Sequence, residues 1–166
     1  TTSSPISLMV AILTSSKIEY LKESYESVRR QQKTSYITWD IYIIVNTLND
    51  EYYNTVIKTF PDVHIQRTVS NGKPGKGHNS VLTFFHKYEK KHDYLFMLDG
   101  DDFLFPCALR HIESYIKNNQ PSLLMLKYHD WISPAIKSQT NNKSRFIIEN
   151  KVDWIFNIPF VMDREW

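Results

Sequence analysis

The sequence predicts an α/β fold in which helices cover both faces of a mostly parallel central sheet. Three observations lead to this class. Short apolar runs, typical of strands buried on both faces, alternate with segments whose apolar residues recur every three or four positions. The connections between these segments are short, as in repeated strand-and-helix units. A length of 166 residues with 42% hydrophobic residues fits one domain with a substantial core.

The first unit combines a strand and a helix. Residues 6–13 (ISLMVAIL) form an almost unbroken apolar run and are predicted to be the first strand. Ser16 and Glu19 have the spacing of a capping box, which predicts a helix beginning there. The apolar side chains of this helix recur at helical spacing: Ile18, Leu21, Tyr25 and Val28.

The same alternation continues along the chain. We expect, in order, a strand at 41–45, a short helix at 50–60, a strand at 63–68, a loop at 70–77, a helix around 81–88 and a strand at 94–98. Pro106 suits the first turn of a further helix, which is followed by a strand at 123–128. Beyond a polar loop at 133–145 we expect short strands at 146–149 and 160–162 and a helical turn at 152–156.

Composition excludes several classes of protein. The formal net charge is only +2 and no arginine-rich stripe is present, which argues against a dedicated nucleic-acid-binding protein. The longest apolar stretches are far shorter than the roughly 20 residues that span a bilayer, so no transmembrane segment is expected. Cys107 is the single cysteine, which excludes an internal disulfide and a cysteine-cluster zinc site. A reducing, cytoplasmic location is therefore expected.

Three acids lie in the most apolar stretch of the chain, YLFMLDGDDFLFP (94–106). Grouped carboxylates repel one another, and a cation among them would offset the repulsion. On a regular strand Asp99 and Asp101 would lie about 6.6 Å apart, but Gly100 allows the backbone to bend. We therefore predict a site for Mg²⁺ or Mn²⁺, which prefer oxygen ligands. The alternative is an acidic turn whose side chains are solvated and hold no ion.

In open α/β sheets ligands bind at the carboxyl ends of the strands, where the loops converge. This rule selects residues 14–16, 46–49, 70–79, 99–102 and 129–130. The segment 70–80 (SNGKPGKGHNS) holds three of the four glycines, with Lys73 and Lys76. It resembles an anion cradle without matching the spacing of a P-loop. A flexible, solvated surface loop is the alternative interpretation.

Four segments in this order carry a resemblance to a known family. They are MVAILTSSKIEYLKESYESVRRQ, IYIIVNTLND, GKGHNSVLTFF and YLFMLDGDDFLFPCALRHIESYI. Together they resemble the nucleotide-sugar half of a family 2 glycosyltransferase with the GT-A fold, over residues 6–130. The resemblance implies a single GT-A-like domain over 1–166. In it, 1–130 bind the nucleotide sugar and 131–166 begin an acceptor-side part that is incomplete.

The resemblance also implies roles for individual residues. Thr14, Ser16 and Asn46 or Thr47 would contact the nucleobase, although the family usually has an acid where Asn46 stands. Lys76 and Asn79 would lie near the ribose and the diphosphate, with His78 at a place where an arginine is common. Asp99, Gly100 and Asp101 match the D-x-D motif, with Asp101 as the main metal ligand, Asp99 beside the ribose or the metal, and Asp102 as an orienting neighbour.

The activity implied is a metal-dependent, inverting transfer of a sugar from a nucleoside diphosphate sugar, with a UDP-sugar as the expected donor and Mn²⁺ or Mg²⁺ as cofactor. The acceptor would be a glycan or another molecule with a hydroxyl group. Such a transfer needs a general base, which in the family lies well downstream. The sequence does not identify this base; the acids available as substitutes are Asp130, Asp153, Asp163 and Glu165.

Two other functions remain open at this point. A non-catalytic module that binds nucleotide sugars would keep the fold without turnover. A phosphatase of the haloacid dehalogenase type also has a D-x-D motif after an apolar strand, with the first acid as nucleophile. That motif normally follows the first strand and carries Thr or Val after its second acid. Here three predicted strands precede the motif and Asp102 follows it, which argues against a phosphatase.

Overall fold

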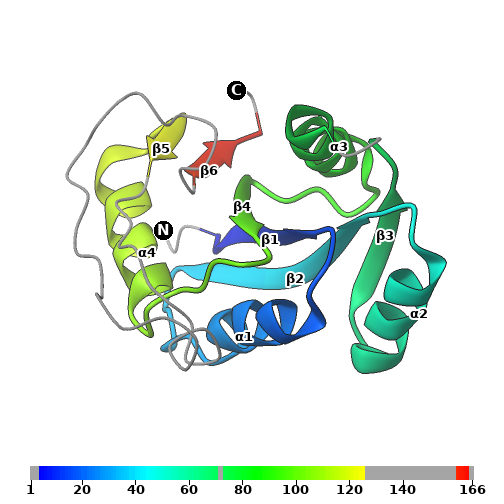
Figure 1. The fold of residues 1–166 in the computed structure, drawn as a ribbon. Helices are drawn as coiled ribbons and strands as arrows, with labels where there is room; N and C mark the ends of the chain where they lie inside the picture. The colour runs from blue at the N-terminus through cyan, green and yellow to red at the C-terminus, as the bar shows by residue number, and fades with distance from the viewer. Residues whose placement is uncertain (1–3, 71–72, 126–159, 165–166) are drawn as a thin grey trace, which may run out of the picture.

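The computed structural model describes residues 4–70, 73–125 and 160–164. In this part of the chain six strands form one sheet with the order β3-β2-β1-β4-β6-β5, accompanied by four helices (Figure 1). In sequence order the elements are β1 (Ile6–Thr14), α1 (Ile18–Arg29), β2 (Ile37–Asn46), α2 (Asp50–Thr59), β3 (His64–Thr68), α3 (Pro74–Lys87), β4 (Tyr94–Asp99), α4 (Ala108–Asn119), β5 (Leu123–Met125) and β6 (Phe160–Asp163).

The centre of the sheet is parallel, as the apolar runs predict. β1 pairs in parallel with β2 on one side and β4 on the other, and β2 pairs in parallel with β3. Residues 8–12 of β1 are all fully buried, because helices cover both faces of this strand. The carboxyl ends of β1, β2 and β4 therefore meet at one edge of the sheet.

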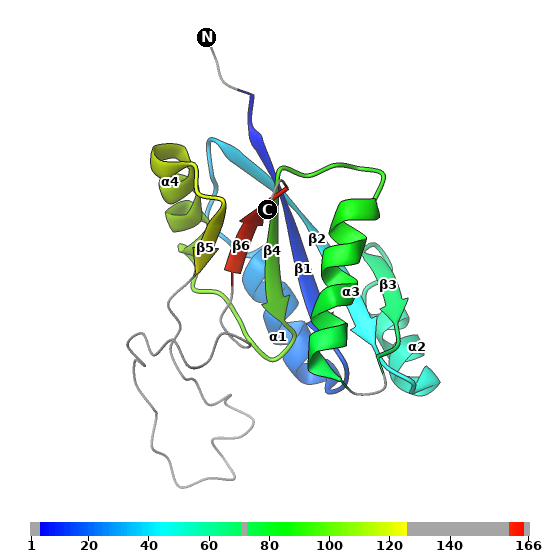
Figure 2. The ribbon, with the colours of Figure 1, turned by 90° about the horizontal axis from the view of Figure 1, so that it is seen from above.

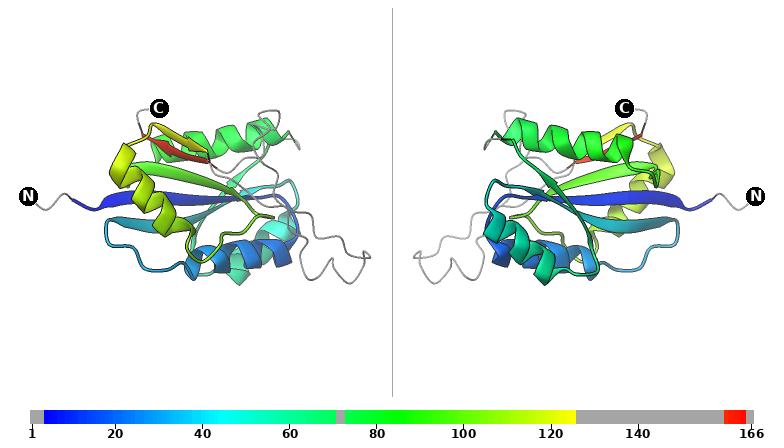
Figure 3. Two further views of the ribbon diagram at one scale, coloured as in Figure 1. Left: turned by 90° about the vertical axis from the view of Figure 1, so that its left-hand side faces the viewer. Right: turned by 90° about the vertical axis from the view of Figure 1, so that its right-hand side faces the viewer.

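The two faces of the sheet are covered by different helices. Leu8, Val10 and Ile12 pack with side chains of α1, α2 and α4, whereas Met9 and Ala11 pack with α3. This division follows the alternation of side chains along a strand. Figure 3 shows α3 on one side of the sheet and α1 and α2 on the other. The predicted fold class, a mostly parallel sheet with helices on both faces, is confirmed.

The last strand departs from the parallel pattern. β6 lies between β4 and β5 and is antiparallel to both (Figure 2). The predicted strand at 160–162 is thus confirmed. Of the strand expected at 123–128, residues 123–125 form β5 and the remainder lies outside the described residues. The elements expected at 133–145, 146–149 and 152–156 also lie outside them.

The predicted capping box at the start of α1 is wrong. The N-cap position is Lys17, one residue after Ser16, and its side chain makes no cap hydrogen bond. Lys17 has a φ of 66°, in the left-handed region that residues other than glycine rarely adopt. Ser16 is therefore exposed in the turn between β1 and α1, where it is available to a ligand.

The loop expected at 70–77 is also partly wrong, because α3 begins at Pro74. Proline suits this first position, since its missing N–H would have had no partner inside the helix. Gly75, Lys76 and Gly77 are consequently helical. Pro106 was expected in the first turn of a helix. It lies instead in the turn before α4, which begins at Ala108.

A search of the described part of the chain for membrane-spanning helices finds none that is both long enough and apolar enough.

Candidate functional site

A pocket of about 380 Å³ opens where β1, β2 and β4 end. Its walls come from the turn after β1, the tip of β2, the first turns of α3 and the tip of β4. The residues that line it are Leu13, Thr14, Ser15, Ser16, Lys17, Tyr20, Asn46, Pro74, His78, Asp99, Gly100 and Asp101. The pocket thus lies at the sheet edge that the carboxyl-end rule selects.

Three carboxylates gather at the tip of β4. Asp99, Asp101 and Asp102 each offer an oxygen atom, and these atoms lie within 4.8 Å of one another. A tight turn brings them together: the Asp102 N–H donates to the Asp99 carbonyl oxygen over 3.0 Å. The predicted bend at Gly100 is therefore present.

Gly100 is needed at this bend because the backbone of β1 is close. Its N–H donates to the Leu13 carbonyl oxygen over 2.7 Å, and a β carbon here would lie 3.0 Å from both that oxygen and the Thr14 β carbon. Any side chain at position 100 would push the acid turn away from β1. The glycine thus fixes the carboxylates against the neighbouring strand.

The acid cluster suits a hard divalent cation. Burial of the Asp102 carboxyl, together with the negative charges of Asp101 and Asp99, raises its pKa to about 7. Such crowding of carboxylates is what a bound cation would relieve. The donor atoms are all carboxylate oxygens, the ligand type that Mg²⁺ and Mn²⁺ prefer. The residues present therefore fit either metal.

His78 forms the positively polarised side of the pocket. Its Nε2 donates to Asp99 Oδ1 over 3.0 Å, and this hydrogen bond raises the pKa of the imidazole above its ordinary value. The second turn of α3 carries His78 to this place, directly after the close contact of Gly77 with β2. From the sequence alone, a capping or packing role is favoured for His78 over a role in the site.

On the β2 side the polar groups of the pocket are held by their neighbours. Asn46 Nδ2 donates to Ser70 Oγ over 2.7 Å, and Ser70 Oγ in turn donates to the Lys73 carbonyl oxygen. Because the hydroxyl hydrogen is already given to a carbonyl, the hydroxyl must accept from the Asn46 amide nitrogen. The buried Thr14 side chain is likewise hydrogen-bonded to the Tyr52 hydroxyl.

Six of the nine residues expected to bind the nucleotide sugar line this pocket: Thr14, Ser16, Asn46, Asp99, Gly100 and Asp101. The other three do not. Thr47 Oγ1 accepts from the Asn49 N–H and so braces the turn before α2. Lys76 and Asn79 are exposed on α3, outside the lining of the pocket.

The structure adds Lys17 and Tyr20 to the site. Both line the pocket, and the Lys17 ammonium lies 5.1 Å from the centre of the Tyr20 ring. The left-handed backbone of Lys17 sets this placement. The sequence offers one signal, a lysine directly after the turn that follows the first strand, but nothing in it reports the backbone conformation.

Of the acids considered as a general base, Asp163 lies in the described part of the chain, and it is not brought to the pocket. Asp163 pairs in register with Tyr94, the first residue of β4, whereas Asp99 is the last. Five residues along a strand span roughly 17 Å, so the register places Asp163 at the opposite end of β4 from the pocket. Asp130, Asp153 and Glu165 lie outside the described residues.

No family model matches this sequence, and no curated protein sequence matches it. Solved structures do resemble it. S. aureus TarS 1-349 superimposes with a TM-score of 0.56 at 18% identity over 74% of this chain, and its complex with UDP-GlcNAc with a TM-score of 0.58 at 14% identity over 78%. The mannosyltransferase PcManGT from Pyrobaculum calidifontis, in complex with GDP-Man and Mn²⁺, gives a TM-score of 0.52 at 14% identity over 74%.

The chain has the GT-A fold. In TarS 1-349 and PcManGT the match covers only 35–36% of their own length, so this chain spans about a third of each. A 4-diphosphocytidyl-2C-methyl-D-erythritol synthase also matches, with a TM-score of 0.54 at 11% identity, over 98% of this chain and 76% of its own. The GT-A fold here therefore resembles both glycosyltransferases and a nucleotidyltransferase.

Proposed function

We propose that this chain is the donor-binding part of a glycosyltransferase that takes a sugar from a nucleoside diphosphate sugar, with UDP-sugar as the donor and Mn²⁺ or Mg²⁺ as cofactor. One observation carries the proposal. Three carboxylates converge at the tip of β4, and two of them, Asp99 and Asp101, line a pocket that extends past β1 to the tip of β2. The solved glycosyltransferases with this fold, in complex with UDP-GlcNAc or with GDP-Man and Mn²⁺, support it.

The residues would divide the donor between them. Asp101 and Asp99 would hold the cation, which would neutralise the diphosphate as it leaves the sugar. Asn46, Thr14 and Ser16, at the far side of the pocket, would face the nucleobase. The Lys17 ammonium and the His78 imidazole, whose pKa the Asp99 hydrogen bond raises, also line the pocket and would face the anionic part of the donor.

We propose an inverting transfer. The bond between the anomeric carbon and the diphosphate oxygen breaks while the acceptor hydroxyl oxygen bonds to that carbon, and the hydroxyl proton passes to a base. The only carboxylates that line the described pocket are Asp99 and Asp101, and both are assigned to the cation. The base is therefore a group other than these two.

The experiment that tests the proposal is a binding panel. UDP-, GDP- and dTDP-sugars are titrated calorimetrically into the protein with and without Mn²⁺, and released nucleotide is then assayed. We expect one class of nucleotide sugar to bind in a Mn²⁺-dependent manner. Binding without release of nucleotide, in the presence of a panel of acceptors, would identify a non-catalytic nucleotide-sugar-binding module instead.

The matching mutation is Asp101→Ala. Because Asp101 is exposed at the rim of the pocket, its loss should leave the fold intact and abolish Mn²⁺-dependent donor binding. Circular dichroism monitors the fold and calorimetry monitors binding. Asp62→Ala, which removes an exposed acid before β3, is the control and should bind the donor as the unmodified protein does. Unchanged affinity in Asp101→Ala would refute the metal assignment.

A further inference from the structure

The chain that leaves the acid cluster has no regular secondary structure of its own. Residues 102–105 are neither helix nor strand, and α4 begins only at Ala108. Its backbone groups have no partners within a helix or strand, so other parts of the protein must supply them. Here the bonds come from the C-terminal end of α1, on the neighbouring part of the same face of the sheet.

Gln31, just after α1, bonds both to this segment and to the first turn of α4. Its side chain is 8% exposed, and its Nε2 donates to the Phe105 carbonyl oxygen over 2.6 Å and to the Ser27 carbonyl oxygen over 3.0 Å. Its Oε1 accepts from the Leu109 N–H over 2.9 Å. Two carbonyl partners and one N–H partner leave a single orientation for the amide.

The bond to Leu109 also replaces a missing helix cap. Cys107 occupies the N-cap position of α4 and makes no side-chain cap hydrogen bond. The free N–H groups at the start of a helix need partners, and the Gln31 oxygen supplies one from another element. Gln31 therefore ties the start of α4 and the preceding segment to the same point on α1.

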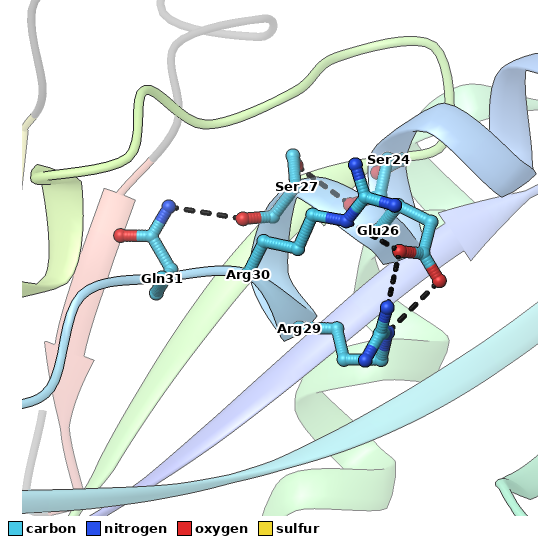
Figure 4. A network of polar contacts seen from close by, with 6 residues as sticks. All are labelled: Ser24, Glu26, Ser27, Arg29, Arg30 and Gln31. Carbon is cyan, nitrogen blue, oxygen red and sulfur yellow. Dashed lines mark hydrogen bonds and ion pairs between the residues drawn. The ribbon is translucent and has the colours of Figure 1, made fainter.

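Ser27 holds the segment closer to the acids. Its hydroxyl donates to the Ser24 carbonyl oxygen over 2.7 Å and accepts from the Leu104 N–H over 2.9 Å. Figure 4 shows Ser24, Ser27 and Gln31 in succession along this end of α1, with Glu26 engaged separately by Arg29 and Arg30. Leu104 is only two residues from Asp102. Two residues of chain span at most about 7 Å, so the Ser27 bond also restricts how far the Asp102 backbone can move.

The acid cluster is thus held from both sides. On the strand side, the Gly100 N–H is bonded to Leu13 in β1. On the outgoing side, α1 holds Leu104 and Phe105. We propose that Gln31 and Ser27 are positioning residues that keep Asp101 and Asp102 in the arrangement that binds a divalent cation. This inference rests on the metal site of the proposed function.

The test compares Mn²⁺ affinities of the full chain, measured from the electron paramagnetic resonance signal of free Mn²⁺. Gln31→Met keeps the length of the side chain and removes its three hydrogen bonds. We expect roughly 10- to 100-fold weaker Mn²⁺ binding, the usual effect of losing a group that orients metal ligands. Ser27→Ala removes one bond to the segment and should weaken binding roughly 3- to 10-fold.

Two matched variants change the same residue types nearby. Gln32→Met alters the adjacent, exposed glutamine, whose side-chain oxygen accepts from Arg110 on the surface and not from the segment 102–105. Ser24→Ala alters a buried serine whose hydroxyl has no hydrogen-bond partner among the described residues. Both should bind Mn²⁺ as the unmodified protein does. UDP affinity in the presence of EDTA, which reports the metal-free pocket, should stay within about twofold in every folded variant.

The outcomes separate this inference from the proposed function. Absence of Mn²⁺ binding in the unmodified protein would overturn the metal site and this inference with it. Equal Mn²⁺ affinity in the unmodified protein and in folded Gln31→Met would overturn the inference alone. If Gln31→Met does not fold, Ser27→Ala decides: the same affinity as Ser24→Ala overturns the inference, and a selective loss of Mn²⁺ affinity supports it.

Discussion

Gly77 lets α3 approach the tip of β2. A β carbon at this position would lie 2.8 Å from Asn46 Nδ2 and 3.5 Å from Leu13 Cδ2. The first distance is too short for two atoms that are not bonded to each other. Asn46 cannot move away freely, because the same nitrogen is hydrogen-bonded to Ser70. The absence of a side chain at Gly77 therefore sets the position of an amide that lines the pocket.

Alanine substitutions at two glycines of α3 should consequently have opposite effects. Gly75→Ala meets no atom within 4 Å and should raise the free energy of unfolding by about 0.5–1 kcal/mol, since alanine favours a helix more than glycine does. Gly77→Ala gains the same helix preference, but its methyl group displaces Asn46 from its hydrogen bond to Ser70. The free energy of unfolding should therefore fall by about 1 kcal/mol. Urea unfolding measures both. A stabilised Gly77→Ala would mean that Asn46 is free to move.

At the scale of single residues the sequence predicted the acid cluster well. Asp99, Gly100 and Asp101 could be assigned because a short apolar strand and a glycine determine where acids at its end must lie. Lys17 could not be assigned, since its role depends on a left-handed backbone that no neighbouring residue reports. Lys76 and Asn79 were expected from a loop, whereas α3 already starts at Pro74 and holds both as exposed residues outside the lining of the pocket.

Among the helices, α2 contacts the site through a residue of its first turn, Tyr52. Its N-cap is Asn49, whose side chain accepts from the Tyr52 N–H over 3.1 Å. Tyr52 in turn places its hydroxyl against Thr14, which lines the pocket. The first turn of α2 therefore supports a wall of the pocket from behind.

Asn49→Ala should destabilise the protein by about 1 kcal/mol, because it removes the cap from the Tyr52 N–H. Asn54→Ala is the matched control: it changes the same residue type at an exposed position inside α2, where alanine is the better helix former. It should leave the stability unchanged or slightly raised. Thermal unfolding followed by circular dichroism compares the two, and an equal effect of both substitutions would argue against the cap.

The strands could be predicted more fully than the helix starts. An apolar run such as 41–45 predicts a strand even when its ends are misjudged, because burial on both faces requires apolar side chains along the whole run. Helix starts depend on single residues. Ser16 and Glu19 have the spacing of a capping box, but the N-cap of the helix is one residue later, at Lys17. The glycines around Lys76 suggest a loop, but Pro74 suits the first turn of a helix and α3 begins there.

For the molecule as a whole, His92, just before β4, links two strands, β1 and β2, at the end of the sheet opposite the pocket. The ring is fully buried between Ser7 Oγ, 2.6 Å from Nδ1, and the Tyr42 hydroxyl, 2.8 Å from Nε2. Burial lowers the pKa of this imidazole, and the partial opposing effect of the Asp40 carboxylate does not reverse the shift. The folded protein therefore holds His92 neutral.

This burial predicts a loss of stability in mild acid. An unfolded chain protonates histidine near pH 6.5, whereas the folded protein resists protonation of His92, so the unfolded state binds more protons as the pH falls below about 6.5. The contribution of His92 to the free energy of unfolding is thus present above that pH and decreases below it.

Urea unfolding at pH 7 and pH 5 measures this effect. His92→Phe should be less stable at pH 7 by about 1–3 kcal/mol, since Ser7 and Tyr42 lose a partner, but its stability should change less between the two pH values. His111→Gln, an exposed histidine on α4, should keep the full pH dependence. An unchanged pH dependence in His92→Phe would show that another group is responsible.

The position of β6 between β4 and β5 has a consequence for the order of assembly. On a ribosome, residues up to Asp99 can already build the four-stranded parallel layer, because each of those strands neighbours one made earlier. β5 emerges next but meets no partner on that layer until residues 160–163 arrive and pair with both β4 and β5. β5 ends at Met125 and β6 begins at Phe160, so 34 residues (126–159) lie between them. While these residues are synthesised, the nascent protein should carry an unpaired edge at β4.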